Sequence, residues 1–219
     1  WKHRRQRQMC IRDRFMASCF LVMVIVGSGI MAENLTNDNA VRLLANTIAT
    51  GAGLFVLITA FANISGAHLN PFVSLSMYLT KRIKGKELLT FIPAQILGCL
   101  LGVMLANVFF EHSIIELSTK NRDGFHIFLS EIVATFGLIF IIFATLKDGK
   151  TTVAACVATY ISAGYWFTSS TSFANPAVAI ARTFTDSFTG INYLNTPTYI
   201  FAELLGAIVA IYIIKRLIK

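Results

Sequence analysis

Apolar residues gather in six long segments that are separated by shorter polar stretches. These segments cover approximately residues 15–31, 41–61, 88–110, 126–146, 151–168 and 197–214. A helix needs about 20 apolar residues to cross a hydrocarbon core of ~30 Å. Each segment therefore predicts a transmembrane helix, the fifth at the short end of the range, and the fold class predicted is an all-α membrane protein.

Two shorter apolar stretches lie between these spans, and each begins with Asn-Pro. Asn70-Pro71 falls between the second and third spans, and Asn175-Pro176 between the fifth and sixth. Asparagine is a favoured N-cap and proline a favoured first helical residue. A helix of about ten residues rises about 15 Å, half of a bilayer core. The pattern predicts two half-membrane helices, which are typical of pores built from an inverted repeat.

The two halves of the chain resemble each other beyond Asn-Pro. Residues 94–100 (AQILGCL) match residues 202–208 (AELLGAI) at an offset of 108, against 105 between the two asparagines. Three spans per half is an odd number, so the second half must insert upside down. We therefore expect one channel domain over residues 15–219, with inverted repeats at about 15–111 and 126–215.

The composition places the chain in a bilayer. Apolar residues make up 55% and charged residues 14%, against about 25% charged residues in soluble domains. The net charge of +8 does not indicate a nucleic-acid partner, because its distribution follows the positive-inside rule. With both termini cytoplasmic, the cytoplasmic pieces hold 15 of the 19 Lys and Arg, leaving four outside: Arg42, Lys120, Arg122 and Arg182.

No constellation of residues predicts an enzyme, a metal site or a cofactor. The four cysteines are scattered without CxxC spacing, and the four histidines are dispersed. No Ser/His/Asp arrangement is apparent. Conduction is therefore favoured over catalysis.

The N-terminal residues 1–14 are strongly basic, and the apolar run begins abruptly at Phe15. No cleavage site of a secretory signal follows that run. Two interpretations stay open: a non-native stretch in place of the natural start, or a genuine cytoplasmic tail.

The segments 65–71 (SGAHLNP) and 175–177 (NPA) resemble the motifs of the major intrinsic proteins, the aquaporins and glycerol facilitators. The resemblance extends from Phe15 to Lys219. It implies six tilted helices around one pore per subunit, and homotetramers. It also implies that Asn70 and Asn175 meet near the midplane and donate hydrogen bonds to a passing solute. Two helix N-termini aimed at that point carry about half a positive charge each, which repels cations and protons.

The resemblance also implies an outer selectivity filter of four residues, which counting from the asparagines places at Thr50, Ala163, Ser172 and Val178. Water-selective members have an aromatic residue, a histidine and an arginine among these positions. Val178 stands where the arginine after Asn-Pro-Ala would be. We therefore expect a wide, weakly polar filter that passes glycerol, urea or neutral metalloid hydroxides such as arsenite. Residues 175–182 resemble a bacterial branch often linked to arsenic resistance, which implies the bacterial inner membrane.

Several other positions carry expectations from the same resemblance. Phe72 replaces the alanine of the first motif and is expected to repack the midplane rather than narrow it, whereas Ala177 keeps the motif. His68 and Glu131 are expected to support the half-helix loops. The first-span counterpart of Glu131 is Arg14. A native arginine there would leave one loop unsupported, whereas in a non-native stretch Arg14 would stand in place of a glutamate.

Two further charged residues have weaker assignments. Glu203 in the sixth span is expected to make a structural hydrogen bond. Arg182 lies seven residues after Asn175 and is expected to face solvent rather than the pore mouth.

Three alternatives to a channel for small uncharged solutes remain. One is a strictly water-selective aquaporin. Another is a coupled secondary transporter, although no acidic residue flanks Asn70 or Asn175 in the sequence. The third is a structural membrane protein that conducts poorly.

Overall fold

A computed structural model describes residues 2–217 of the chain, with side chains from Gln8 onward. Trp1, in the predicted tail, and Ile218 and Lys219, at the end of the predicted channel domain, lie outside the described residues. In order, the helices are α1 (Lys2–Leu35), α2 (Asn39–Ser65), α3 (Pro71–Leu79), α4 (Gly85–Phe109), α5 (Phe125–Thr145), α6 (Lys150–Phe167), α7 (Pro176–Ala181), the 3-10 turn η1 (Arg182–Phe184) and α8 (Thr196–Leu217).

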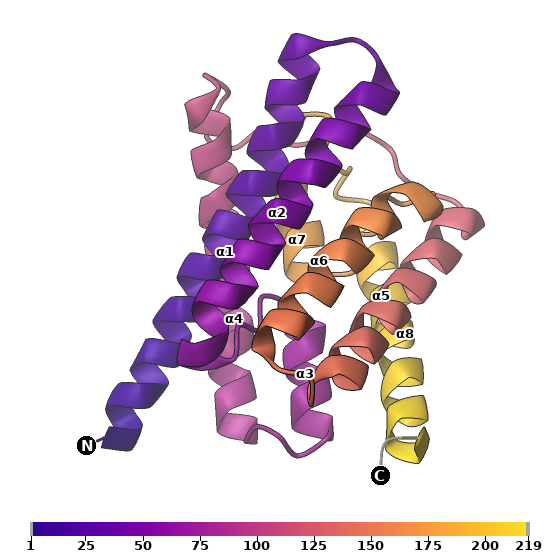
Figure 1. The fold of residues 1–219 in the computed structure, drawn as a ribbon. Helices are drawn as coiled ribbons and strands as arrows, with labels where there is room; N and C mark the ends of the chain where they lie inside the picture. Colours follow the sequence, from indigo (N-terminus) through magenta and orange to yellow (C-terminus); the bar gives the residue numbers. More distant parts are fainter. Residues whose placement is uncertain (1, 218–219) are drawn as a thin grey trace.

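Six long helices form an elongated bundle around two short ones, α3 and α7 (Figure 1). Five of the long helices in the described part of the chain are long and apolar enough to cross a membrane. The remaining long helix, α6, has 18 residues and corresponds to the fifth predicted span, which is the short one. Helix α1 runs through the expected boundary at Arg14 without a break. The fold class predicted from the sequence is confirmed.

The packing of the helices follows the inverted repeat. Helix α1 packs on α4, and their counterparts α5 and α8 pack on each other in the same way. Helix α2 contacts its own counterpart α6, and α3 contacts α7. The short helix of each half also contacts the last long helix of the other half, as α4 with α7 and α3 with α8. The two halves therefore interlock around the short helices.

Small residues allow the long helices to approach each other closely. A Cβ added to Gly98 or Gly102 of α4 would overlap a backbone carbonyl oxygen of α1, and one added to Gly206 of α8 would overlap a carbonyl oxygen of α5. The glycines of the third and sixth spans therefore serve helix packing, which is a common role of small residues in membrane proteins.

The short helices begin where the Asn-Pro pairs predict. Asn70 and Asn175 are the N-caps of α3 and α7, and a proline occupies the first turn of each helix. Helix α3 has nine residues, whereas α7 has six and continues into the three residues of η1. Helix α1 begins and α8 ends at the same end of the molecule (Figure 1). We call this end proximal and the opposite end, toward which α7 points, distal.

Candidate functional site

The two N-cap asparagines meet in the middle of the bundle. The Asn70 side-chain nitrogen donates to the carbonyl oxygen of Ala174 at 2.6 Å, and that of Asn175 donates to Leu69 at 2.9 Å. Their side-chain oxygens accept from the first backbone N–H groups of α3 and α7. An asparagine amide has two N–H donors, so one on each residue remains for a solute. The crossed bonds fix both helix N-termini against each other.

Two glutamates hold the loop that leads into α7. Glu131 of α5 accepts hydrogen bonds from the backbone N–H groups of Phe173 (2.9 Å) and Ala174 (2.8 Å). Glu203 of α8 accepts from the backbone N–H of Asn175 at 2.9 Å. Both glutamates are fully buried. Three successive amides thus have carboxylate acceptors, which stabilises a loop whose Ala174 has a φ of 47°.

The loop that leads into α3 is held by different chemistry. Gln95 of α4, the counterpart of Glu203, donates from its side-chain nitrogen to the carbonyl oxygen of His68 (2.5 Å) and to the Ser74 hydroxyl (3.0 Å). Arg14 of α1 donates to the carbonyl oxygen of Ser65 at 2.8 Å. Its guanidinium centre lies 3.5 Å from the centre of the Phe91 ring. One loop is therefore held through its N–H groups and the other through its carbonyls.

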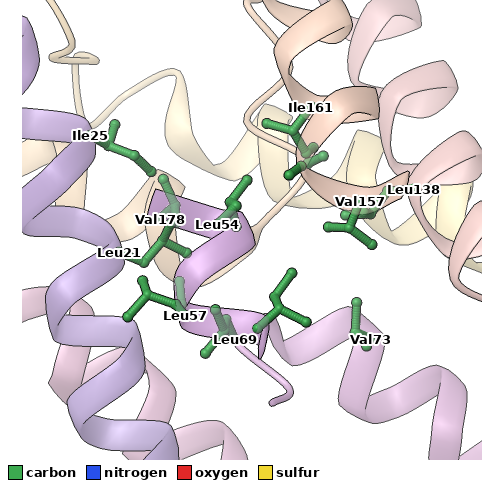
Figure 2. Packing of buried hydrophobic residues seen from close by; sticks show 14 of the residues in the cluster. Leu21, Ile25, Leu54, Leu57, Leu69, Val73, Leu138, Val157, Ile161 and Val178 are labelled. Carbon is green, nitrogen blue, oxygen red and sulfur yellow. The ribbon is translucent and has the colours of Figure 1, made fainter. Parts of the chain in front are cut away.

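A cavity of about 450 Å³ passes between the half-helices and both asparagines line it. Its wall is mainly apolar, and buried hydrophobic side chains from α1, α2, α5 and α6 that Figure 2 labels contribute to it. These side chains include Leu21, Ile25, Leu54, Leu138, Val157 and Ile161. Among the described residues, no group of three or more His, Cys, Asp or Glu side chains is placed to hold a metal ion. The site is a lined passage with a few fixed polar groups.

Comparison with known proteins identifies this arrangement. Residues 2–165 match the model of the family described as "Major intrinsic protein". The chain is 47% identical over 210 residues to the aquaglyceroporin AqpS of Rhizobium meliloti (strain 1021), covering 96% of this chain and 90% of that relative. The chain belongs to the major intrinsic protein family.

More distant relatives agree with this assignment. The chain is 27% identical over 209 residues to aquaporin-4 of Rattus norvegicus, and that match covers 91% of this chain and 64% of the relative. The X-ray structure of the aquaglyceroporin from Plasmodium falciparum superposes with a TM-score of 0.77, covering 97% of each chain at 20% identity; this match shows the fold. As a major intrinsic protein, the chain is a passive membrane channel for small uncharged solutes and not an enzyme.

The structure brings three of the four expected filter residues of this major intrinsic protein to the cavity. Thr50, Ser172 and Val178 line it, and all three are buried. The expectation for Ala163 is wrong, because Ala163 lies on the exposed face of α6. Tyr165 lines the cavity instead, and its hydroxyl lies 3.1 Å from that of Thr50. Two residues along a helix is more than half a turn, so counting from Asn175 selected the opposite face of α6.

The expectation that Arg182 faces solvent is also wrong. Its exposed fraction is 3%, and it lines the distal end of the cavity. Arg182 follows α7 directly, in η1, one helical turn beyond Val178. The guanidinium that Val178 lacks is therefore present at the mouth, farther from the asparagines.

Phe72 and His68, on either side of Asn70 in the sequence, differ in whether they line the cavity. Phe72 is half-buried, packs against the hydrophobic core and is not among the cavity-lining residues, as repacking predicts. His68 is buried and lines the cavity, and its carbonyl oxygen accepts the bond from Gln95. His68 therefore supports the loop through its backbone carbonyl oxygen, while the residue also forms part of the cavity wall.

Replacing Arg14 with glutamate is expected to stabilise the channel. Residues 68 and 69 are the counterparts of the two whose N–H groups Glu131 accepts, and within residues 8–217 their N–H groups make no hydrogen bond. A carboxylate at position 14 would supply the missing acceptors, which raises the free energy of unfolding by about 1–3 kcal/mol. Thermal unfolding in detergent measures the change. Arg12→Glu makes the same charge change at an exposed position and should leave the unfolding temperature unchanged; equal shifts in both variants would contradict the prediction.

Proposed function

We propose that this channel conducts glycerol and similar small polyols together with water, down their concentration gradients. The observation that carries the proposal is Val178, an apolar side chain on the cavity wall directly after Asn-Pro-Ala. Glycerol has a carbon face and a hydroxyl face. The apolar wall suits the first, while the Asn70 and Asn175 amides suit the second. The name of the 47% identical relative, an aquaglyceroporin, supports this substrate class.

The filter in this proposal consists of Thr50, Tyr165, Ser172 and Val178. Three hydroxyls and one valine offer hydrogen bonds on one side and an apolar contact on the other. None of the four side chains is charged, so the filter holds no charged group that would bind a passing neutral solute strongly. Urea and neutral metalloid hydroxides such as arsenite share the size and polarity of glycerol and belong to the same proposed substrate class.

Exclusion of ions follows from the centre of the channel. Helices α3 and α7 direct their N-termini at the asparagines, and each N-terminus carries about half a positive charge. The crossed bonds between Asn70 and Ala174 and between Asn175 and Leu69 keep this arrangement fixed. A cation or proton therefore meets a barrier that an uncharged polyol does not.

The proposed setting is a homotetramer in the inner membrane of a bacterium, with both termini in the cytoplasm. Large apolar side chains remain exposed along the outside of the helices, among them Leu44, Ile48, Leu97, Phe201 and Tyr212. Lipid and neighbouring subunits would cover such surfaces. The excess of Lys and Arg at the proximal end supports a cytoplasmic orientation of that end.

A strictly water-selective channel is the second candidate, and one contact favours it. The hydrogen bond between Tyr165 and Thr50 (3.1 Å) joins α6 to α2, and both residues line the cavity together with Arg182. If this contact persists during conduction, the opening beside it narrows toward the size of water.

Stopped-flow light scattering of proteoliposomes distinguishes the two candidates. Under an inward glycerol gradient, vesicles with the protein should reswell much faster than empty vesicles, and under an osmotic gradient they should also shrink faster. Fast water flux with glycerol uptake equal to that of empty vesicles would contradict the glycerol proposal and support the water-selective candidate.

A further inference from the structure

A second cavity, of about 360 Å³, opens at the distal end of the molecule. We call it the distal vestibule; its lining includes Lys120, Arg122, Thr171, Arg182 and Phe188. Arg182 lines both this vestibule and the main cavity. The vestibule therefore lies at the distal mouth of the pore, and three of its lining residues carry positive charge.

Arg182 is held firmly but keeps most of its donors. Its Nε–H donates to the carbonyl oxygen of Thr189, and its guanidinium centre lies 3.5 Å from the centre of the Phe173 ring. A guanidinium has five N–H donors. Within the described residues the other four N–H donors make no hydrogen bond, although the exposed fraction of Arg182 is only 3%. A buried cation that lines both cavities thus keeps four donors without a hydrogen bond in the described part of the chain.

Arg122 lies near the same Phe173 ring as Arg182. It donates to the carbonyl oxygens of Gly190 (2.9 Å) and Phe188 (3.0 Å), and its guanidinium centre lies 5.6 Å from the Phe173 ring centre. Three of its N–H donors remain without a bond in the described part of the chain. Burial lowers the pKa of this arginine.

The nearby acidic groups are already engaged. Glu33 lies 3.4 Å from the Lys120 ammonium and also accepts the backbone N–H of Phe188. Glu131 accepts the backbone N–H groups of Phe173 and Ala174. Lys120 therefore has a carboxylate partner, whereas among residues 8–217 neither Arg182 nor Arg122 forms an ion pair with a carboxylate. The positive charges of Arg182 and Arg122 repel each other, and an anion between them would offset this repulsion.

We infer that the distal vestibule is a binding site for a small dissolved oxyanion or carboxylate, held by the free guanidinium N–H groups of Arg182 and Arg122. Guanidinium groups bind such anions through paired, charge-assisted hydrogen bonds. Because Arg182 also lines the main cavity, a bound anion sits at the pore mouth. On the function proposed above, it should slow the passage of uncharged solutes.

Calorimetric titration of the purified channel with inorganic phosphate tests the site directly, with chloride at equal ionic strength as the reference. We expect saturable binding of phosphate and none of chloride. Arg182→Gln should weaken phosphate binding by roughly tenfold or more. Arg182→Lys keeps the positive charge but loses the paired N–H donors of the guanidinium, so it should weaken phosphate binding less. Arg42→Gln is the matched control, because Arg42 lies at the same end but caps carbonyl oxygens of Glu33 and Thr36.

The outcomes separate the site from the proposed function. Equal affinity in the wild type and Arg182→Gln, or no saturable binding in the wild type, would overturn the inference. If Arg182→Gln fails to fold, the comparison of Arg182→Lys with Arg42→Gln decides instead. Binding is measured without solute flux, so it stands or falls independently of glycerol conduction.

A flux measurement tests the position of the site at the pore mouth. In proteoliposomes that conduct glycerol, phosphate at saturating concentration should slow wild-type glycerol uptake and leave the Arg182→Gln variant unaffected. Vesicles of phosphatidylcholine with and without phosphatidylglycerol should show the same slowing, since the occupant is a dissolved anion. Slow uptake that requires phosphatidylglycerol and not phosphate would overturn that assignment in favour of a lipid headgroup.

Discussion

Replacing Glu131 with glutamine is expected to destabilise the channel strongly. Glu131 offers both carboxylate oxygens to the backbone N–H groups of Phe173 and Ala174 in a fully buried setting. Glutamine keeps one acceptor and turns an N–H group toward the other amide. A buried donor left without an acceptor costs about 1–3 kcal/mol. The free energy of unfolding should fall by at least that amount, which a shift of thermal unfolding in detergent measures.

Loss of solute flux should accompany this loss of stability, because Glu131 positions the loop that ends at Asn175. Glu111→Gln is the matched control, since Glu111 is exposed and follows α4 at the distal end. It should unfold and conduct like the wild type. A Glu131→Gln protein with the wild-type unfolding temperature would show that the loop does not depend on this carboxylate.

Replacing Val178 with arginine is expected to suppress glycerol passage far more than water passage. Val178 is buried on the cavity wall, and Arg182 lies one turn beyond it. An arginine at 178 would fill the apolar side of the opening and add a second guanidinium to the mouth. Glycerol uptake should fall by about tenfold or more, equivalent to ~1.4 kcal/mol in the barrier, while water flux falls less.

Val178→Leu separates size from charge in this experiment. Leucine adds volume to the same wall without donors or charge, so its effect on glycerol should be smaller than that of arginine. Stopped-flow rates for water and glycerol in both variants, normalised to the amount of protein, give the comparison. Equal loss of water and glycerol in Val178→Arg would contradict a filter role for Val178.

The architecture could be predicted from the sequence because its signals are local. Apolar length marks the spans, and an Asn-Pro pair contains both the cap and the first residue of each half-helix. The matching residues 94–100 and 202–208 even pair Gln95 with Glu203, and both side chains bind the half-helix loops. The support role of Gln95 was missed, although this alignment carried the signal for it.

The filter was predicted less well because it depends on loop geometry. Thr50 and Val178 follow from helix positions, but Ala163 required an assumed length for the loop after α6. The structure places Tyr165 on the cavity wall instead, and its hydroxyl makes the proposed filter more polar than expected. A tyrosine two residues after an alanine on a short helix carries no sign of which one faces inward.

Arg182 was misplaced for a related reason. A straight, exposed helix would place Arg182 in solvent, two turns after Asn175. Instead, α7 ends at Ala181, η1 follows, and the Arg182 side chain donates to the carbonyl oxygen of Thr189, in the segment 185–191. Arg14 illustrates a different limit. Its long side chain reaches the carbonyl oxygen of Ser65, so a residue expected to leave the loop unsupported makes a contact of opposite polarity.

Glycerol permeability and proton leak, measured together in one preparation of proteoliposomes with an internal pH dye, test the central claim most directly. The claim is that apolar walls and the fixed asparagine pair pass uncharged polyols and exclude charge. Vesicles with the protein should take up glycerol much faster than empty vesicles while an imposed pH gradient decays at the rate of empty vesicles. Glycerol uptake no faster than in empty vesicles, or a pH gradient that collapses as fast as glycerol equilibrates, would contradict it.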